Sequence, residues 1–201
     1  MKDQYKTRFT LIQRIQTKDR DDATWEDFVD SYENYIYVII KNFKLNPSLC
    51  QDLLQNVLLQ LWKDLPKFEY RPNKCRFRTW LSVVTKNVVR TYLKSKAGRN
   101  EKQNIEYSSA LHSVDNISDS EIEEIAEKEW KVFILEKALD NLRSSISERI
   151  MIVLQDSFNN TPTKTTAEKL GTKEASIRVY RQRGTNALKK EVLRLNTELD
   201  M

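Results

Sequence analysis

Glycine is almost absent from this chain, which contains three Gly and four Pro among its 201 residues. Hairpin turns in sheet proteins use glycine for positive φ angles, and loops that cradle phosphate use it to bring the backbone close to the ligand. An all-β fold and a nucleotide-binding α/β fold are therefore disfavoured, which leaves helices. The length allows one domain of moderate size or two small ones, each able to bury a core.

Apolar residues recur at helical spacing through the first half of the chain. From Leu53 to Leu65 they follow the i, i+1, i+4, i+5 pattern of one helix face. Asn46 and Pro47 mark the start of this helix, because Asn caps well and Pro fits a first turn, and Pro66 marks its end. Similar patterns predict helices over residues 25–43 and 77–92.

The helix predicted over 77–92 has a second, basic face. Basic and polar residues follow one another at intervals of four along it: Arg78, Ser82, Lys86, Arg90 and Lys94. Residues 67–94 contain eight basic groups and a single acid, while residues 173–190 contain six and a single acid. One such cluster alone is as well explained by a solvated surface. Two clusters, one in each half of the chain, favour a polyanionic partner with two contact zones.

The helical pattern fades between residues 96 and 128. Residues 108–127 contain six acids and no Lys or Arg. We expect an acidic flexible linker here, becoming helical from Asp119 with Ser118 or Asp119 as its cap. Apolar spacing then returns from Trp130 onward. The predicted fold is all-α, with two small helical domains at 1–95 and 129–201 joined by the linker at 96–128.

Residues 163–180 have the spacing of a helix-turn-helix. Ala167 is small enough for helix contact, Gly171 can take positive φ in the turn, and Ile177 anchors the second helix. That helix would begin near Lys173 or Glu174 and present its polar residues to duplex DNA, where Arg can read guanine edges or hold phosphates. The candidate contacts are Lys173, Glu174, Ser176, Arg178, Arg181 and Arg183. An ordinary helical hairpin with a glycine cap is the alternative. Gly184, within the same helix, costs about 1 kcal/mol relative to Ala.

The segment at residues 67–76 joins two predicted helices and mixes cations with Phe68 and Tyr70. This composition is typical of sites that bind single-stranded nucleic acid, because bases stack on aromatic rings while cations pair with the phosphates. The alternative is that both rings simply cover helix ends.

Nothing in the sequence indicates an enzyme. His112 is the only histidine and lies in the polar linker, and no nucleophile, carboxylate pair or phosphate loop has a recognisable context. We expect no catalytic residue, metal or cofactor. Cys50 and Cys75 are too few for a disulfide framework or a zinc site, which favours a reducing compartment. Without a run of eighteen apolar residues, we expect a cytoplasmic protein with no membrane insertion.

Three motifs in order resemble one known family. They are QDLLQNVLLQLW at 51–62, FRTWLSVVTKN at 77–87 and AEKLG at 167–171. Together they resemble alternative sigma factors of bacterial RNA polymerase, in the extracytoplasmic-function group of the sigma-70 family. The resemblance implies a region 2 helical bundle in the first domain and a region 4 helix-turn-helix in the second.

The resemblance also implies roles for individual residues. Core RNA polymerase would bind the helix at 51–62 through Asp52, Gln55, Asn56 and Gln60. The minus-10 element of the promoter would be bound and melted, with a base flipped into a protein pocket. The residues implied are Lys67, Phe68, Tyr70, Arg71, Asn73, Lys74, Arg76, Arg78, Trp80, Lys86, Asn87 and Arg90. The helix-turn-helix residues given above would contact the minus-35 element as duplex.

A different class of function stays open at this point. A helix-turn-helix repressor or activator that is not a polymerase subunit would explain the second basic cluster, but it leaves the first one without a role. An anti-sigma factor or another DNA-targeting recruiter is also a possible partner.

Overall fold

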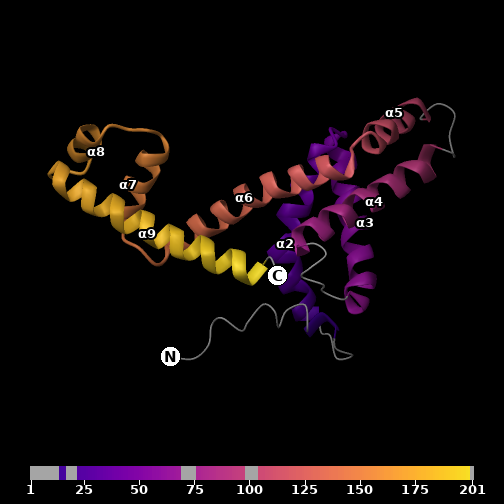
Figure 1. Ribbon diagram of the computed structural model, residues 1–201, viewed down its shortest axis with the longest axis horizontal. Helices are drawn as coiled ribbons and strands as arrows, with labels where there is room; N and C mark the ends of the chain where they lie inside the picture. The colour runs from indigo at the N-terminus through magenta and orange to yellow at the C-terminus, as the bar shows by residue number, and fades with distance from the viewer. Residues whose placement is uncertain (1–13, 17–21, 69–75, 98–103, 200–201) are drawn as a thin grey trace. The chain divides into compact units, whose positions relative to one another are not determined.

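A computed structural model describes residues 14–16, 22–68, 76–97 and 104–199, without the side chains of 97 and 104–106. All regular structure in these ranges is helical, so the all-α prediction is confirmed for them (Figure 1). The chain divides into two compact units, residues 1–133 with 198–201, and residues 134–197. Among the described helices, none is both long and apolar enough to cross a membrane.

The first unit is built on α2 (Asp22–Asn42), α3 (Pro47–Asp64) and α4 (Phe77–Ala97), with a short 3-10 turn, η2 (Leu65–Lys67), after α3. The Asn46 side chain accepts a hydrogen bond from the Ser48 N–H at 3.0 Å, and Pro47 occupies the first turn, as predicted. The three helices share a core of fully buried apolar side chains: Phe28, Ile36, Ile39, Leu53, Val57, Leu61, Phe77 and Leu81. The amphipathic patterns predicted for α2 and α3 therefore correspond to faces that meet, whereas the apolar face predicted on α4 enters the core only at its first turns.

The structure does not show the flexible linker expected at 96–128. Residues from 104 onward form α5 (Asn104–Asp115) and the first half of α6 (Asp119–Arg143). Val114, Ile122 and Ala126 are buried at 0–1% exposure, so this segment contributes to the core of the first unit. These three buried positions were not predicted because the segment around them is mostly polar.

The start of α6 agrees with the prediction. The Ser118 hydroxyl accepts a hydrogen bond from the Glu121 N–H at 3.2 Å, and the Glu121 carboxylate accepts one from the Ser118 N–H at 2.7 Å. This reciprocal pair is a capping box. The hydrogen bond from the Ser118 backbone is the largest cause of a lowered pKa at Glu121.

The second unit contains α7 (Glu148–Phe158), α8 (Thr163–Lys169) and most of α9 (Glu174–Leu199). Val153, Ala167 and Ile177 form its buried cluster, with Leu170 and Tyr180 packed against them. The turn between α8 and α9 contains Gly171 at φ +57°, a conformation that L side chains rarely adopt. The helix starts at Glu174, where the spacing predicted it.

Candidate nucleic-acid interface

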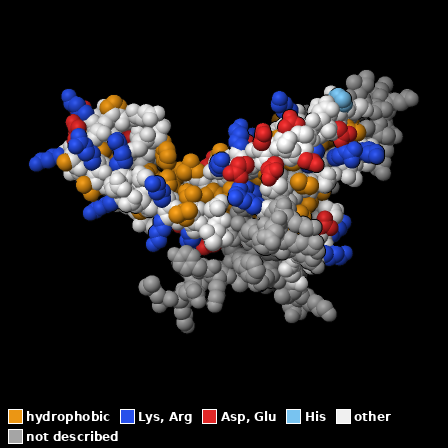
Figure 2. Space-filling view, in the orientation of Figure 1, with side chains coloured by type: hydrophobic (Ala, Val, Ile, Leu, Met, Phe, Trp, Pro, Cys, Tyr) orange, Lys and Arg blue, Asp and Glu red, His pale blue; other side chains and the backbone are white. Residues whose placement is uncertain are grey.

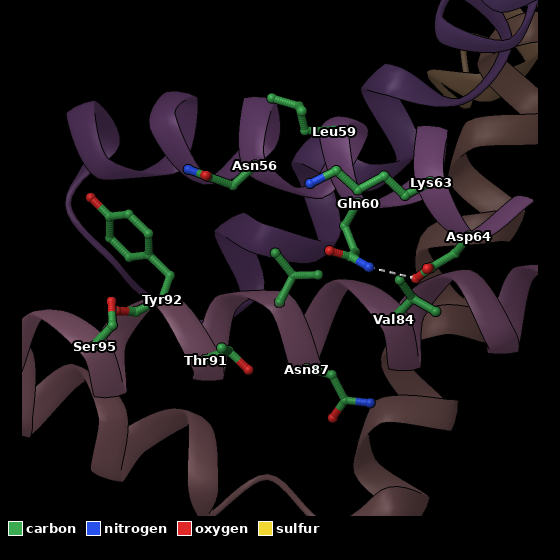
Figure 3. Close-up of a pocket in the computed structure, with 11 residues that line it drawn as sticks. Asn56, Leu59, Gln60, Lys63, Asp64, Val84, Asn87, Thr91, Tyr92 and Ser95 are labelled. Carbon is green, nitrogen blue, oxygen red and sulfur yellow. Dashed lines mark hydrogen bonds between the residues drawn. The ribbon is translucent and has the colours of Figure 1, made fainter.

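A groove of about 630 Å³ runs between α3 and α4 on the first unit. Most of the residues that line it carry amide, hydroxyl or charged groups, although much of the lining surface is apolar (Figure 3): Asn56, Leu59, Gln60, Lys63, Asp64, Val84, Asn87, Val88, Thr91, Tyr92 and Ser95. Figure 3 shows Gln60 pointing from α3 toward α4, with its amide donating to the Asp64 carboxylate at 2.9 Å. Tyr92 points from α4 toward α3. The lining thus offers donors and acceptors of the kind that bind base edges.

The four residues predicted to bind polymerase separate into two places on α3. Asp52 and Gln55 are exposed on the helix surface. Asn56 and Gln60 instead line the groove, together with Asn87 from the predicted minus-10 set. The sequence did not single out Leu59, Asp64 or Tyr92, because each can only be assigned to the groove once α3 and α4 are paired in space.

Phe68 belongs to an aromatic cluster at the start of α4. Its ring centroid lies 4.2 Å from that of Trp80 and 5.7 Å from that of Phe77. Phe77 is fully buried, and Phe68 and Trp80 are half-buried. For Phe68 the structure favours the alternative reading, in which the ring covers helix ends. Four other predicted contacts lie outside the described residues: Tyr70, Arg71, Asn73 and Lys74.

The predicted basic stripe on α4 is covered at Arg78 and Lys86, whereas Arg90 and Lys94 are exposed. Arg78 is only 3% exposed and forms an ion pair with Glu127. The Lys86 ammonium donates to the Ile117 carbonyl and lies 3.8 Å from the Asp119 carboxylate. Arg90 pairs with Asp115. All three carboxylates come from the segment that was expected to be a flexible linker.

A buried hydrogen bond and a partly buried ion pair hold α6 against α2 and α4. The Tyr35 hydroxyl is buried, lies 3.1 Å from the Ser82 hydroxyl and donates to the Ala126 carbonyl at 3.1 Å; burial raises the pKa of Tyr35. Desolvation acts to raise the pKa of Glu127, but the hydrogen bond and charge of Arg78 outweigh it and lower that pKa. Glu127 is therefore ionised at neutral pH.

The remaining minus-10 candidates are exposed. Lys67, Arg76 and Asn87 face solvent, and Arg76 lies 4.0 Å from the Glu127 carboxylate. They could meet a ligand without any rearrangement of α4.

In the second unit, the minus-35 candidates lie at the start of α9 and along its first three turns, with Lys173 just before the helix. Lys173, Glu174, Arg178 and Arg183 are exposed, whereas Ser176 and Arg181 are half-buried. The Arg181 guanidinium donates to the Ser157 hydroxyl at 2.9 Å, so this side chain is held against α7. Four of the six candidates are therefore accessible.

No group of three or more His, Cys, Asp or Glu suited to a metal ion occurs among the described residues. His112 is exposed on α5.

Comparison with known families gives one match, and it coincides with the groove. Residues 28–99 match the family model for Sigma-70 region 2. Residues 28–99 form a sigma-70 region 2 domain. The match runs from within α2 through α3 and η2 to the end of α4, so both walls of the groove belong to region 2. No curated protein matches the chain.

Region 2 implies the function of sigma-70 family sigma factors. These are non-enzymatic transcription initiation factors that bind core RNA polymerase and the minus-10 element of promoter DNA. Because the match ends before α5, it gives no support for the predicted extracytoplasmic-function group or for region 4.

Proposed function

We propose that this chain is an alternative sigma factor of the extracytoplasmic-function group. In this proposal α3 docks on core RNA polymerase, the α3–α4 groove accepts an unpaired base of the minus-10 element, and α9 reads the minus-35 duplex. The observation that carries the proposal is the region 2 match over α2–α4. The competing function, a helix-turn-helix regulator independent of polymerase, gives no reason for that match.

The exposed face of α3 supports the docking role. Asp52 and Gln55 lie one helical turn apart and are both exposed, while Leu53, Leu54 and Val57 behind them are buried. A charge change at Asp52 therefore alters the surface without disturbing the core.

Docking is tested by co-elution of the full chain with purified bacterial core RNA polymerase. Asp52→Lys should weaken the complex at least tenfold. Asp30→Lys is the matched control, since Asp30 is an exposed acid on α2 of the same domain. Equal affinity of the two variants would remove α3 as the docking face, and no complex with the unmodified chain would refute the proposal as a whole.

The groove supports the capture of an extruded base. Gln60 and Asn87 carry amides, and an amide can donate to and accept from a base edge at once. Tyr92 adds a ring on which a base can stack. Extrusion costs a few kcal/mol, which such contacts offset only after the strand has opened.

Asn87→Ala and Gln60→Ala should therefore reduce promoter melting more than they reduce polymerase binding. The assay is permanganate reactivity on intact and premelted templates, with Asn116→Ala as a control because Asn116 is an exposed amide outside the groove. A premelted bubble should restore part of the lost transcription. Equal loss on both templates would exclude base capture by the groove.

The proposed minus-35 role of α9 can be tested by separating residues that read the DNA sequence from residues that only contact phosphates. Arg178 is exposed near the start of the helix and Lys189 lies further along it. Arg178→Ala should relax sequence preference, whereas Lys189→Ala should only lower overall affinity and flatten the salt dependence. A salt-insensitive affinity would instead indicate that α9 binds a protein.

A further inference from the structure

The ion pairs between α4 and the α5–α6 segment follow one register. Arg90, Lys86 and Arg78 are separated by four and eight residues, and their partners Asp115, Asp119 and Glu127 are separated by the same four and eight in the opposite order. Two antiparallel chain segments give this pattern, with Asp115 at the end of α5 and Asp119 and Glu127 on α6. The acids therefore meet α4 at Arg90, Lys86 and Arg78.

The contact covers the cations best at Arg78 and Lys86, whereas Arg90 and the Asp119 carboxylate stay exposed. Arg78 and Lys86 are 3% and 13% exposed, so their charges have largely left water and depend on the partners they meet. The Arg78 guanidinium also lies 5.8 Å from the centre of the Trp130 ring. Figure 2 shows acidic side chains gathered over the first part of α6, with Lys and Arg beside them. A DNA phosphate would need the same positions that the carboxylates hold.

We propose that residues 104–127 are an intramolecular competitor of nucleic acid for the basic face of α4. The carboxylates of Asp115, Asp119 and Glu127 stand where phosphates of the promoter would bind, and the segment leaves α4 when DNA is engaged. This inference rests on the proposed function and extends the DNA contacts of region 2 from the α3–α4 groove to the basic face of α4. Displacement of the segment exposes the cations but also uncovers Val114, Ile122 and Ala126, so the free chain binds DNA weakly through region 2.

The test removes the three charges and leaves α4 unchanged. The variant Asp115→Asn, Asp119→Asn, Glu127→Gln should bind a labelled single strand of mixed sequence about tenfold more tightly than the control at about 50 mM salt. Its salt slope should be steeper by about 2, because three added phosphate contacts contribute about 0.7 each. Loss of Glu127 also leaves Arg78 buried without its carboxylate, which favours release of the segment.

The control carries the same change of charge at other exposed acids of α6. In Glu123→Gln, Glu124→Gln, Glu136→Gln, none of the replaced carboxylates belongs to the three pairs. General electrostatics predicts equal gains in the two triple variants, and equal gains would overturn the proposal.

A second measurement uses the unmodified chain, so that it does not depend on the folding of a variant. Hydrogen exchange is measured with and without the same single strand at saturating concentration. Amides of 104–127 should lose protection when DNA binds, while those of α3 should not. Retained protection of α5 and α6 with DNA bound would refute displacement. Neither experiment contains polymerase, so failure here is distinguishable from failure to form a complex with core polymerase.

Discussion

Replacement of Gly184 by Ala should destabilise the second unit, although helix propensity alone predicts the opposite. Gly184 is buried within α9, and an added Cβ would lie 2.9 Å from Leu154 Cδ1 and 3.1 Å from Ile150 Cγ2. Both neighbours are on α7. The glycine thus allows the two helices to approach closely, which the sequence alone could only register as a weak helix position.

The expected size follows from two opposing contributions. Ala gains about 1 kcal/mol over Gly in a helix interior. Overpacking of a filled site costs about 1–3 kcal/mol. Leu154 is 3% exposed and Ile150 is β-branched, so neither moves aside freely. We expect a net loss of up to about 2 kcal/mol in the free energy of unfolding of this unit.

The tryptophans make the assay specific to one unit. All four lie within residues 1–133, at positions 25, 62, 80 and 130. Denaturation followed by tryptophan fluorescence therefore reports the first unit, and Gly184→Ala should not change the midpoint of that transition. Native-state hydrogen exchange in peptides from α7 and α9 should show the loss, since protection there measures opening of the second unit.

A double-mutant cycle identifies the cause. Leu154→Val removes the Cδ atom nearest to the added methyl, so Gly184→Ala should be neutral or stabilising in that background. The coupling energy should be at least about 1 kcal/mol. A stabilising Gly184→Ala single variant, or a coupling near zero, would refute the close approach of α7 and α9.

Three further changes test other parts of the structure. Gly171→Ala should cost about 1–2 kcal/mol in urea denaturation, because φ is +57° and no neighbour would contact the new methyl. Lys44→Gly should instead stabilise the first unit by about 0.5–1 kcal/mol, since Lys44 is held at φ 57° after α2. Acidification should release the α5–α6 segment, because the pKa of Glu127 is lowered in the fold. The stabilisation that the Glu127–Arg78 pair gives to the fold is therefore present above the ordinary Glu range and is lost as pH falls through the folded pKa. Increased exchange of α5 amides below about pH 4 would show this, whereas unchanged exchange would exclude an ionic contact.

Helices and caps could be predicted from the sequence because their signals are local. The Asn46 cap, the Ser118 cap and the turn at Gly171 each depend on residues within one or two turns, and each lies where the pattern predicted it. The core faces of α2 and α3 were predicted for the same reason. On α4 the prediction was only half right, because Val84, Val88 and Tyr92 line the groove while Val89 and Leu93 are buried. The amphipathic period is a property of one helix and needs no knowledge of its neighbours.

The groove could not be predicted in this way. Asn56 and Gln60 resembled docking residues because they lie on the same helix as Asp52, and only the pairing of α3 with α4 brings them beside Asn87. Similarly, the sequence shows Gly184 only as an unfavourable helix residue, and the structure shows that α7 packs too closely against it for a side chain.

The exposure of the basic stripe on α4 could not be predicted for a different reason. Periodicity correctly placed Arg78, Lys86 and Arg90 on one face of α4, but exposure was assumed from charge. The complementary spacing of Asp115, Asp119 and Glu127 was present in the acidic segment and was interpreted as solvated linker composition. Asp115 ends α5 and Asp119 begins α6, so the turn between these helices sets the spacing of the two acids. The match between the acids and the cations of α4 therefore depends on how α5 and α6 pack on α4, which is not a local property of either segment.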